Sequence, residues 1–186
     1  MDSTIYILCG GKSTRMMTDK ALSIYKGETF LSRIIKAVDY LESSIVLVSS
    51  NPKHTNLNTG CIPDIINNKG PVSGIITALK NTVTDTNIIL SCDLPLIKKD
   101  LINWLLNQHK ADYDGTVITC NGKQMPLIAI YNKNSLPVFE RHLINEQLKL
   151  MNVLKELHIN FVEIPENLAY QTANINTPKQ LKELSL

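Results

Sequence analysis

Short apolar runs alternate with segments of helical periodicity in the first 110 residues, and no other feature constrains the fold as strongly. The apolar runs lie at residues 4–9, 44–49 and 87–93. Apolar side chains recur at helical spacing in residues 28–41, 72–80 and 101–106. Apolar runs of this length are typical of strands buried on both faces of a parallel sheet. The alternation predicts an α/β fold, a Rossmann-like three-layer αβα arrangement with a mostly parallel central sheet.

The pattern changes after residue 114. Two strands are predicted at residues 115–120 and 126–131, joined through a turn at Asn121–Gly122. The sheet is therefore expected to be partly mixed. Further along we expect helices near 135–144 and 147–157, a strand at 160–164, and a last helix begun by Thr177 and Pro178. We interpret residues 1–186 as a single domain with halves at 1–110 and 111–186.

The composition argues against several classes of function. A formal net charge of +2 is too small to suggest a nucleic-acid partner, and no apolar run is long enough to span a membrane. The first residues lack the pattern of a signal peptide, so we expect a cytoplasmic protein. The four cysteines and four histidines are dispersed, without the spacing of a zinc or dithiol site. We expect free, mostly buried thiols, and histidines with ordinary surface or capping roles.

The segment after the first strand has the composition of a phosphate-binding loop. Residues 10–20 contain two glycines and three cations, in neither the GxGxxG nor the GxxxxGK[ST] spacing. Gly10 and Gly11 would let backbone amides approach a phosphate closely, while Arg15 and Lys20 would neutralise its charge. A solvated turn with ordinary surface charges is the alternative.

Polar residues also follow the later strands, where ligands of open α/β sheets bind. Asn51 ends the second strand, Asp64 follows Ile62–Pro63, and Asp93 ends the strand at 87–93. A carboxylate at a strand tip suits Mg²⁺, which prefers hard oxygen ligands and shares them with phosphate. Taken alone, Asp93 would equally serve to cap the next turn. The convergence of Asn51, Asp64 and Asp93 on one edge of the sheet favours a nucleotide site.

The same segments carry a resemblance to a known family. Residues 8–20, LCGGKSTRMMTDK, resemble the LAGGxSxRMGxDK signature of the molybdenum cofactor guanylyltransferases. Later landmarks of that family are matched in order by IPD at 62–64, GPVSG at 70–74, SCDLP at 91–95 and NINTP at 174–178. The resemblance covers nearly the whole chain. It implies a fold of the nucleotide-diphospho-sugar transferase type, with 1–110 as the nucleotide-binding half and 111–186 as the acceptor-side half.

The resemblance assigns roles to individual positions. The residues it implies in nucleotide binding are Leu8, Cys9, Gly10, Gly11, Lys20, Asn51, Asp64 and Asp93. Within this set, Asn51 and Asp64 would lie near the guanine and ribose, and Asp93 matches the magnesium ligand. Asn174 and Asn176 match positions near the pterin, although Asn-x-Asn before a helix also has a capping role. Gly10–Gly11 favours GTP over CTP, because cytidylyl relatives tend to carry LAAG.

Two positions depart from the signature. Met17 stands where the family usually has glycine, which leaves the backbone path of the phosphate loop open if that glycine has a positive φ. Cys9 replaces an alanine, a small change that still fits at a strand end. Cys9 and Cys92 are expected close together on neighbouring strands, without a disulfide in a reducing compartment.

The resemblance implies a Mg²⁺-dependent transfer of GMP from GTP to the terminal phosphate of molybdenum-molybdopterin. Pyrophosphate would leave, steadied by Arg15 and Lys20, and the molybdopterin guanine dinucleotide cofactor would form. GTP and molybdopterin are thus the expected partners, with molybdenum-cofactor insertion proteins or apo-molybdoenzymes as recipients of the product. The alternatives are a molybdopterin cytidylyltransferase, another small-molecule nucleotidyltransferase of the same fold, and a non-catalytic nucleotide-binding module that docks on assembly partners.

Overall fold

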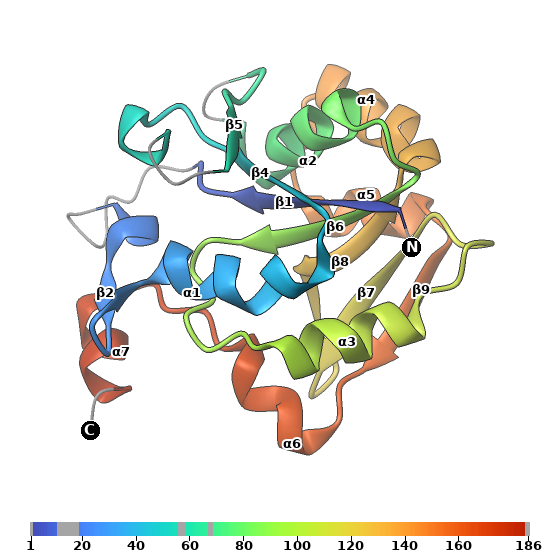
Figure 1. The fold of residues 1–186 in the computed structure, drawn as a ribbon. Helices are drawn as coiled ribbons and strands as arrows, with labels where there is room; N and C mark the ends of the chain where they lie inside the picture. The colour runs from blue at the N-terminus through green and yellow to red at the C-terminus, as the bar shows by residue number, and fades with distance from the viewer. Residues whose placement is uncertain (1, 11–18, 56–58, 67–68, 185–186) are drawn as a thin grey trace.

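The central sheet organises the molecule (Figure 1). The computed structural model describes residues 2–10, 19–55, 59–66 and 69–184. Within these residues a seven-stranded sheet has the order β5-β4-β1-β6-β8-β7-β9. The strands are β1 (Ser3–Leu8), β4 (Ser44–Val48), β5 (Gly60–Ile62), β6 (Thr86–Ser91), β7 (Gly115–Cys120), β8 (Lys123–Asn132) and β9 (Ile159–Glu163). Strand β8 runs antiparallel to β6 and β7, and the other neighbours are parallel. The prediction of a mostly parallel, partly mixed α/β sheet is confirmed.

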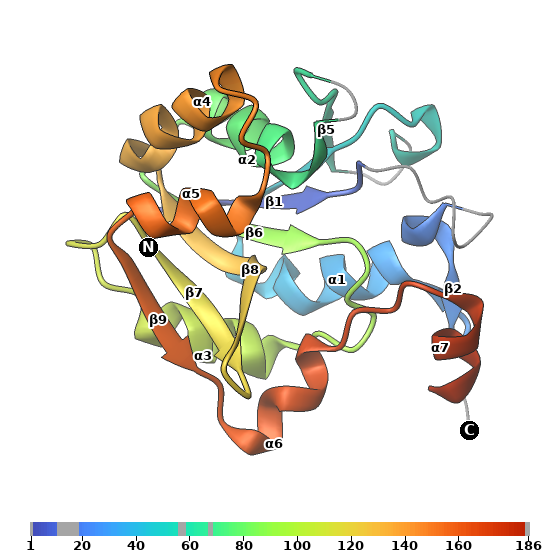
Figure 2. The ribbon, with the colours of Figure 1, turned by 180° about the vertical axis from the view of Figure 1, so that it is seen from behind.

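Helices cover both faces of the sheet (Figures 1 and 2). Helices α1 (Phe30–Val38) and α3 (Lys99–Gln108) pack on one face, and α2 (Gly70–Asn81), α4 (Leu136–Ile144) and α5 (Leu150–Glu156) on the other. Strand β1 is buried on both faces, which explains the four consecutive apolar residues at positions 5–8. Its Ile5 and Ile7 belong to the core beneath α1 and α3, whereas Tyr6 and Leu8 belong to the core beneath α2, α4 and α5.

Several predicted boundaries have local causes. Helix α1 begins at Phe30 because the Thr29 side chain accepts a hydrogen bond from the Ser32 amide across 3.1 Å. The turn at Asn121–Gly122 joins β7 to β8, and its φ angles of 51° and 73° suit the tight hairpin predicted there. Thr177 caps α7 (Pro178–Glu183) in a reciprocal capping box with Gln180, as expected from Thr177–Pro178.

Some elements were not predicted. They are the small antiparallel pair β2 (Ile24–Tyr25) and β3 (Glu28–Thr29), strand β5, helix α6 (Glu166–Ala169), and the 3-10 turns η1 (Lys20–Leu22), η2 (Asp39–Leu41), η3 (Pro52–His54), η4 (Lys133–Ser135) and η5 (Tyr170–Thr172). Elements of two to four residues are too short to show a hydrophobic period.

None of the helices in the described residues has both the length and the apolar character needed to cross a membrane.

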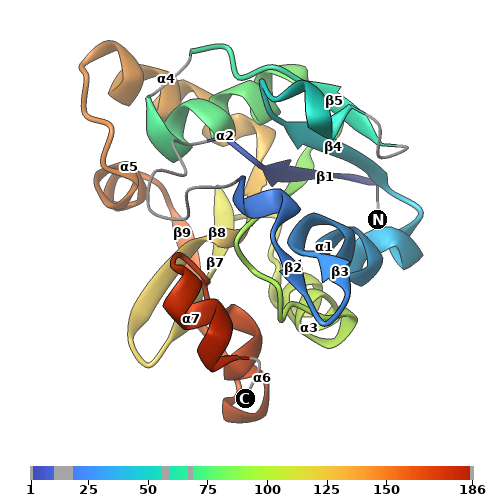
Figure 3. The same cartoon turned by 90° about the vertical axis from the view of Figure 1, so that its left-hand side faces the viewer.

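The C-terminal segment returns to the start of the chain. Ile175 packs with Tyr25 and Phe30 in a small apolar cluster, and the Tyr25 hydroxyl donates to the Leu184 carbonyl across 3.3 Å. Figure 3, which looks toward the carboxyl ends of β1 and β6, shows α7 beside β2 at this end of the molecule. The fold therefore brings residues near 175 to the end of the sheet where the loop after β1 lies.

Candidate active site

The carboxyl ends of β5, β4, β1 and β6 lie side by side, because these four strands are adjacent and parallel. Each is followed by a residue that the sequence singled out: Asp64 after β5, Asn51 after β4, Gly10 after β1 and Asp93 after β6. The site residues described here therefore share one edge of the sheet. Gly11 and Arg15, together with Met17, lie outside the described residues.

Lys20 and Asp93 meet the C-terminal segment at this edge. Lys20 Nζ lies 3.9 Å from Asp93 Oδ2 and donates a hydrogen bond to Asn176 Oδ1 across 2.5 Å. Asn174 Nδ2 donates to Asp93 Oδ1 across 3.0 Å, and the Ile175 amide donates to the Asp93 carbonyl across 2.9 Å. Three segments far apart in the sequence thus form one cluster around Asp93, whose side chain is only 12% exposed.

The cluster also contains a suitable set of oxygen atoms for a divalent cation. Oδ1 of Asn174 is buried and has no hydrogen-bond partner in the described part of the chain. Nδ2 of the same amide donates to the Asp93 carboxylate, so the free oxygen lies next to that carboxylate. Mg²⁺ is usually bound through one or two protein oxygens, with substrate phosphates and water supplying the rest. Among residues 2–10, 19–55, 59–66 and 69–184, no three His, Cys, Asp or Glu side chains gather closely enough to hold a metal by themselves. Asp93 and Asn174 therefore fit a metal that a nucleotide helps to bind.

Asp64 is held at the start of α2. Its Oδ1 accepts hydrogen bonds from the Thr77 hydroxyl at 3.0 Å, from the Ile66 amide at 3.2 Å and from the Ser73 hydroxyl. Its Oδ2 faces Gly10, where an added Cβ would lie 3.9 Å away. One carboxylate oxygen thus fixes the side chain, and the other points toward the loop after β1.

A second polar network joins the loop after β1 to the end of β4. Asp19 Oδ1 accepts from the Ala21 amide at 2.9 Å, and Oδ2 accepts from the Asn51 side chain. Asn51 Oδ1 in turn accepts from the Lys53 amide at 3.0 Å, so both ends of this side-chain amide are engaged within the protein. Asn51 therefore helps to hold Asp19 in this structure.

His54 completes that network, and its surface or capping role was wrongly predicted. The side chain is 0% exposed, with Nδ1 2.7 Å from Ser49 Oγ and Nε2 3.1 Å from Asp19 Oδ2. His142 is also buried, between α4 and α5, with Nε2 2.9 Å from Glu156 Oε1. Nothing in the sequence indicated that His54 is buried, because a single histidine in a loop belongs to no repeating pattern of apolar residues. The one available signal was Asn51–Pro52, which begins a turn that folds residue 54 back over residue 51.

The thiols near the site follow the expected arrangement in part. Cys92 is buried, whereas Cys9, Cys61 and Cys120 are only partly buried, and all four are free. A hydrogen bond with the Cys92 thiol, together with burial, raises the pKa of the Cys9 thiol well above its ordinary value. Cys9 therefore stays protonated at neutral pH and contributes its backbone and volume rather than a nucleophile.

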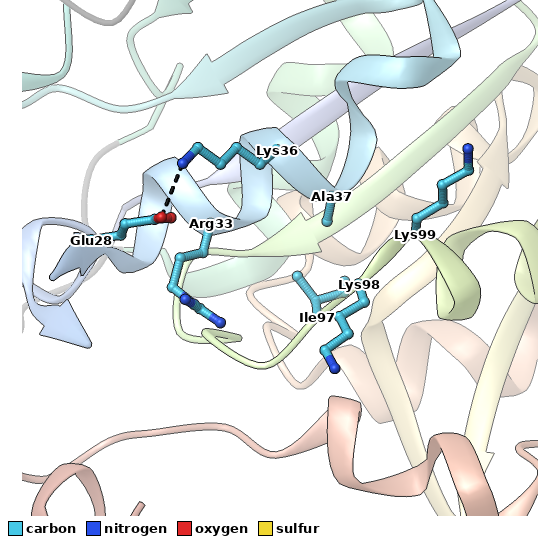
Figure 4. A pocket seen from close by; sticks show the side chains of 7 residues that line it. All are labelled: Glu28, Arg33, Lys36, Ala37, Ile97, Lys98 and Lys99. Carbon is cyan, nitrogen blue, oxygen red and sulfur yellow. Dashed lines mark ion pairs between the residues drawn. The ribbon is translucent and has the colours of Figure 1, made fainter. Parts of the chain in front are cut away.

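A basic pocket lies elsewhere, between α1 and the start of α3 (Figure 4). It is lined by Glu28, Arg33, Lys36, Ala37, Ile97, Lys98 and Lys99. Its cations are already engaged: Lys36 pairs with Glu28 at 3.0 Å, and Arg33 Nε donates to the Pro95 carbonyl at 2.7 Å. The ammonium groups of Lys98 and Lys99 lie over tyrosine rings. None of the predicted site residues lines this pocket, so the cluster at the strand ends is the better candidate active site.

Comparison with known proteins agrees with this geometry. The profile of the MobA-like NTP transferase domain matches residues 5–160. A probable molybdenum cofactor guanylyltransferase of Flavobacterium johnsoniae is 36% identical, over 98% of this chain and 96% of the relative. One of Carboxydothermus hydrogenoformans is 34% identical, over 97% and 94% respectively.

A solved structure supports the fold. Molybdopterin-guanine dinucleotide biosynthesis protein A of Archaeoglobus fulgidus superposes with a TM-score of 0.83 at 20% identity, covering 98% of this chain and 96% of that one. The architecture is accordingly that of the nucleotide-diphospho-sugar transferase fold, as predicted. With a matching profile over most of its length and full-length relatives above 30% identity, the chain belongs to the family of MobA-like NTP transferase domains and is a nucleotidyltransferase.

Proposed function

We propose that this nucleotidyltransferase transfers GMP from GTP to the terminal phosphate of molybdenum-molybdopterin. An oxygen of that phosphate attacks the α-phosphorus of GTP, the bond from the α-phosphorus to the bridging oxygen breaks, and pyrophosphate leaves. The observation that carries the proposal is the cluster of Lys20, Asp93 and Asn174 at the strand ends, which pairs a cation with oxygen donors. The names of the full-length relatives and the Gly10–Gly11 pair support guanine as the base.

The proposed roles follow from charge and position. Asp93 and Asn174 would hold Mg²⁺, which when bound supplies positive charge to the phosphates that react and leave. Lys20, fixed by Asn176, would neutralise the departing pyrophosphate, with Arg15 acting beside it. Phosphoryl transfer depends mainly on positioning and charge neutralisation. The side chains around Asp93 therefore suit direct displacement between two bound substrates.

Other assignments belong to the same proposal. Leu8, Cys9, Gly10 and Gly11 would present their backbone to the nucleotide, and Asp64 Oδ2 would face the ribose from beside Gly10. Residues 1–110 would form the nucleotide-binding half of a single domain, and residues 111–186 the acceptor-side half. The free thiols are consistent with action in the reducing cytoplasm, where insertion proteins or apo-molybdoenzymes would receive the product.

Nucleotide binding is the first test. GTP, CTP, ATP and UTP are titrated calorimetrically against the protein with Mg²⁺ and again with a chelator, using Lys20→Ala as the test variant and Lys36→Ala as the control. We expect selective, Mg²⁺-dependent GTP binding that Lys20→Ala weakens and Lys36→Ala leaves unchanged. Preference for CTP would instead indicate a cytidylyltransferase. Mg-GTP binding without pyrophosphate release in the presence of molybdopterin would indicate a non-catalytic docking module.

A further inference from the structure

His54 is enclosed by the protein and bridges two polar groups. Its imidazole is 0% exposed and lies between Ser49 Oγ, 2.7 Å from Nδ1, and Asp19 Oδ2, 3.1 Å from Nε2. The Nε2 contact is close without the alignment of a hydrogen bond, so this buried nitrogen has the Asp19 carboxylate beside it but no hydrogen-bond partner among the described residues. Burying a polar ring is costly unless its polar atoms are hydrogen-bonded, and Nε2 lacks such a bond in the described part of the chain. The position of His54 therefore needs an explanation other than core packing.

The contacts of His54 lead directly to Lys20. Asp19 is the residue that caps η1, because its Oδ1 accepts from the Ala21 amide, and η1 begins with Lys20. The other oxygen of the same carboxylate faces His54 and accepts from the Asn51 side chain. One carboxylate thus ties the end of β4 to the residue before Lys20. Shifting Asp19 would move the point from which the Lys20 side chain reaches Asn176 and Asp93.

The far side of the ring is equally constrained. The Ser49 hydroxyl contacts Nδ1 and accepts the Asn51 amide at 3.1 Å, and the His54 amide donates to the Asn51 carbonyl at 3.0 Å. The ring is therefore anchored to strand β4, which lies in the centre of the parallel part of the sheet. Ser49 at the end of β4, the buried ring and the Asp19 carboxylate form a continuous series of contacts that leads to Lys20. Groups supported in this way hold the geometry that phosphoryl transfer requires.

We propose that His54 and Asp19 form a positioning pair that sets the place of Lys20 in the nucleotide site. The inference rests on the proposed function, because it assumes that Lys20 contacts the nucleotide phosphates. Neither His54 nor Asp19 needs to touch the substrate. Their effect passes through Lys20, so it depends on the Lys20 ammonium group.

The test measures GTP affinity by calorimetry with Mg²⁺ in His54→Phe, His54→Gln and Asp19→Asn, each alone and combined with Lys20→Ala. We expect His54→Phe to weaken GTP binding about tenfold, equivalent to about 1.4 kcal/mol. His54→Gln, which keeps a polar side chain beside Asp19, should stay within about threefold of the wild type. On the Lys20→Ala background, His54→Phe should change the affinity by less than about twofold, because coupled residues are not additive.

The matched control is His142→Phe, which removes a comparably buried imidazole beside a carboxylate away from the strand ends. It should lower the melting temperature and leave GTP affinity unchanged. The direction in which Asp19→Asn changes GTP affinity is an independent test. This variant replaces His54→Phe if His54→Phe fails to fold. Removing a negative charge beside a phosphate site would by itself tighten GTP binding, whereas loss of positioning weakens it.

Any one of three results would overturn the inference. The first is that His54→Phe weakens GTP binding no more than His142→Phe does, and the second is that His54→Phe causes the same loss of GTP affinity on the Lys20→Ala background as in the wild type. The third is that Asp19→Asn binds GTP more tightly than the wild type. A wild-type protein that prefers CTP contradicts the guanylyl assignment, and the pair is then judged by the same criteria with CTP. A wild-type protein that binds no nucleotide overturns both.

Discussion

Nζ of Lys20 donates a hydrogen bond to Oδ1 of Asn176 across 2.5 Å, joining residues 156 positions apart in the sequence. Asn176 belongs to the segment that the family resemblance places near the pterin. The contact links this segment to Lys20, which the proposed function places at the nucleotide phosphates, and neighbouring Asn174 links the same segment to Asp93. We therefore predict that the C-terminal segment supports the nucleotide side of the proposed site.

Asn176→Ala should weaken GTP binding more than it weakens acceptor binding. Lys20 would lose the oxygen that orients its ammonium group. We expect GTP affinity to fall about three- to tenfold, a modest effect for a hydrogen bond to a charged group, because the Lys20 side chain is 22% exposed. Calorimetric titration with Mg-GTP measures the loss, and steady-state pyrophosphate release gives KM for each substrate. Lys179→Ala is the control, since that exposed side chain pairs only weakly with Glu183 at 3.9 Å. A rise confined to the acceptor KM would contradict the prediction.

Asp93→Asn should abolish most turnover while the fold is kept. The amide oxygen of asparagine still accepts the hydrogen bond of Asn174, but it lacks the charge that would hold Mg²⁺. We expect pyrophosphate release to fall by about 10²–10³-fold, the loss typical of removing one electrostatic group from an active site. Thermal melting checks that the variant is folded. Turnover close to that of the wild type would remove Asp93 from the proposed metal site.

Asn174→Ala should raise the Mg²⁺ concentration needed for half-maximal activity. The variant loses both the amide contact to Asp93 and the buried oxygen beside it. A titration of pyrophosphate release against Mg²⁺ at saturating GTP measures the shift. An unchanged Mg²⁺ requirement with a raised acceptor KM would assign Asn174 to the acceptor, as the family resemblance alone implies.

Much of the fold could be predicted because a strand that is buried on both faces shows a continuous run of apolar residues in the sequence. Residues 5–8 of strand β1 are all apolar, since Ile5 and Tyr6 belong to the cores on opposite faces of the sheet. Strand β5 and the β2–β3 pair show no such run of apolar residues. Their two or three residues are strands only through pairing with a partner strand, such as Val46 with Gly60.

Candidate site residues could be named from the sequence where the residue type suits one chemistry, as with Asp93 at the end of β6 and Lys20 after the glycine-rich segment. The structure places these two side chains 3.9 Å apart, and their roles stay predictions. His54 was not predictable, because its burial depends on the turn of η3 and on Asp19, which reaches it from a distant loop. Contacts between segments that are remote in the sequence leave no local pattern to detect.

Gly115→Ala should destabilise the protein by crowding the start of β7. An added Cβ would lie 2.5 Å from the Ile130 carbonyl oxygen and 3.1 Å from Tyr131 Cδ1, and a backbone atom cannot move aside as a side-chain tip does. We expect a loss of about 1–3 kcal/mol in the free energy of unfolding, measured by urea denaturation. Gly60→Ala is the matched control in strand β5, where the nearest atoms lie at 3.5 Å, and it should change stability by less than about 0.5 kcal/mol. Equal stabilities of the two variants would contradict the predicted clash.

His109 should make the protein less stable in mild acid. Burial lowers the pKa of this imidazole from its ordinary value of 6.5, an effect that a hydrogen bond with Asn132 partly offsets. Below about pH 6.5 the unfolded chain therefore binds a proton that the folded protein resists, so stability falls as the pH falls. His109→Gln keeps a polar partner for the Thr116 hydroxyl, which lies 3.1 Å from Nδ1, and removes the titrating group. The melting temperature of the variant should drop less than that of the wild type between about pH 7.5 and pH 5.5. Equal drops in the two proteins would place the acid sensitivity on other groups.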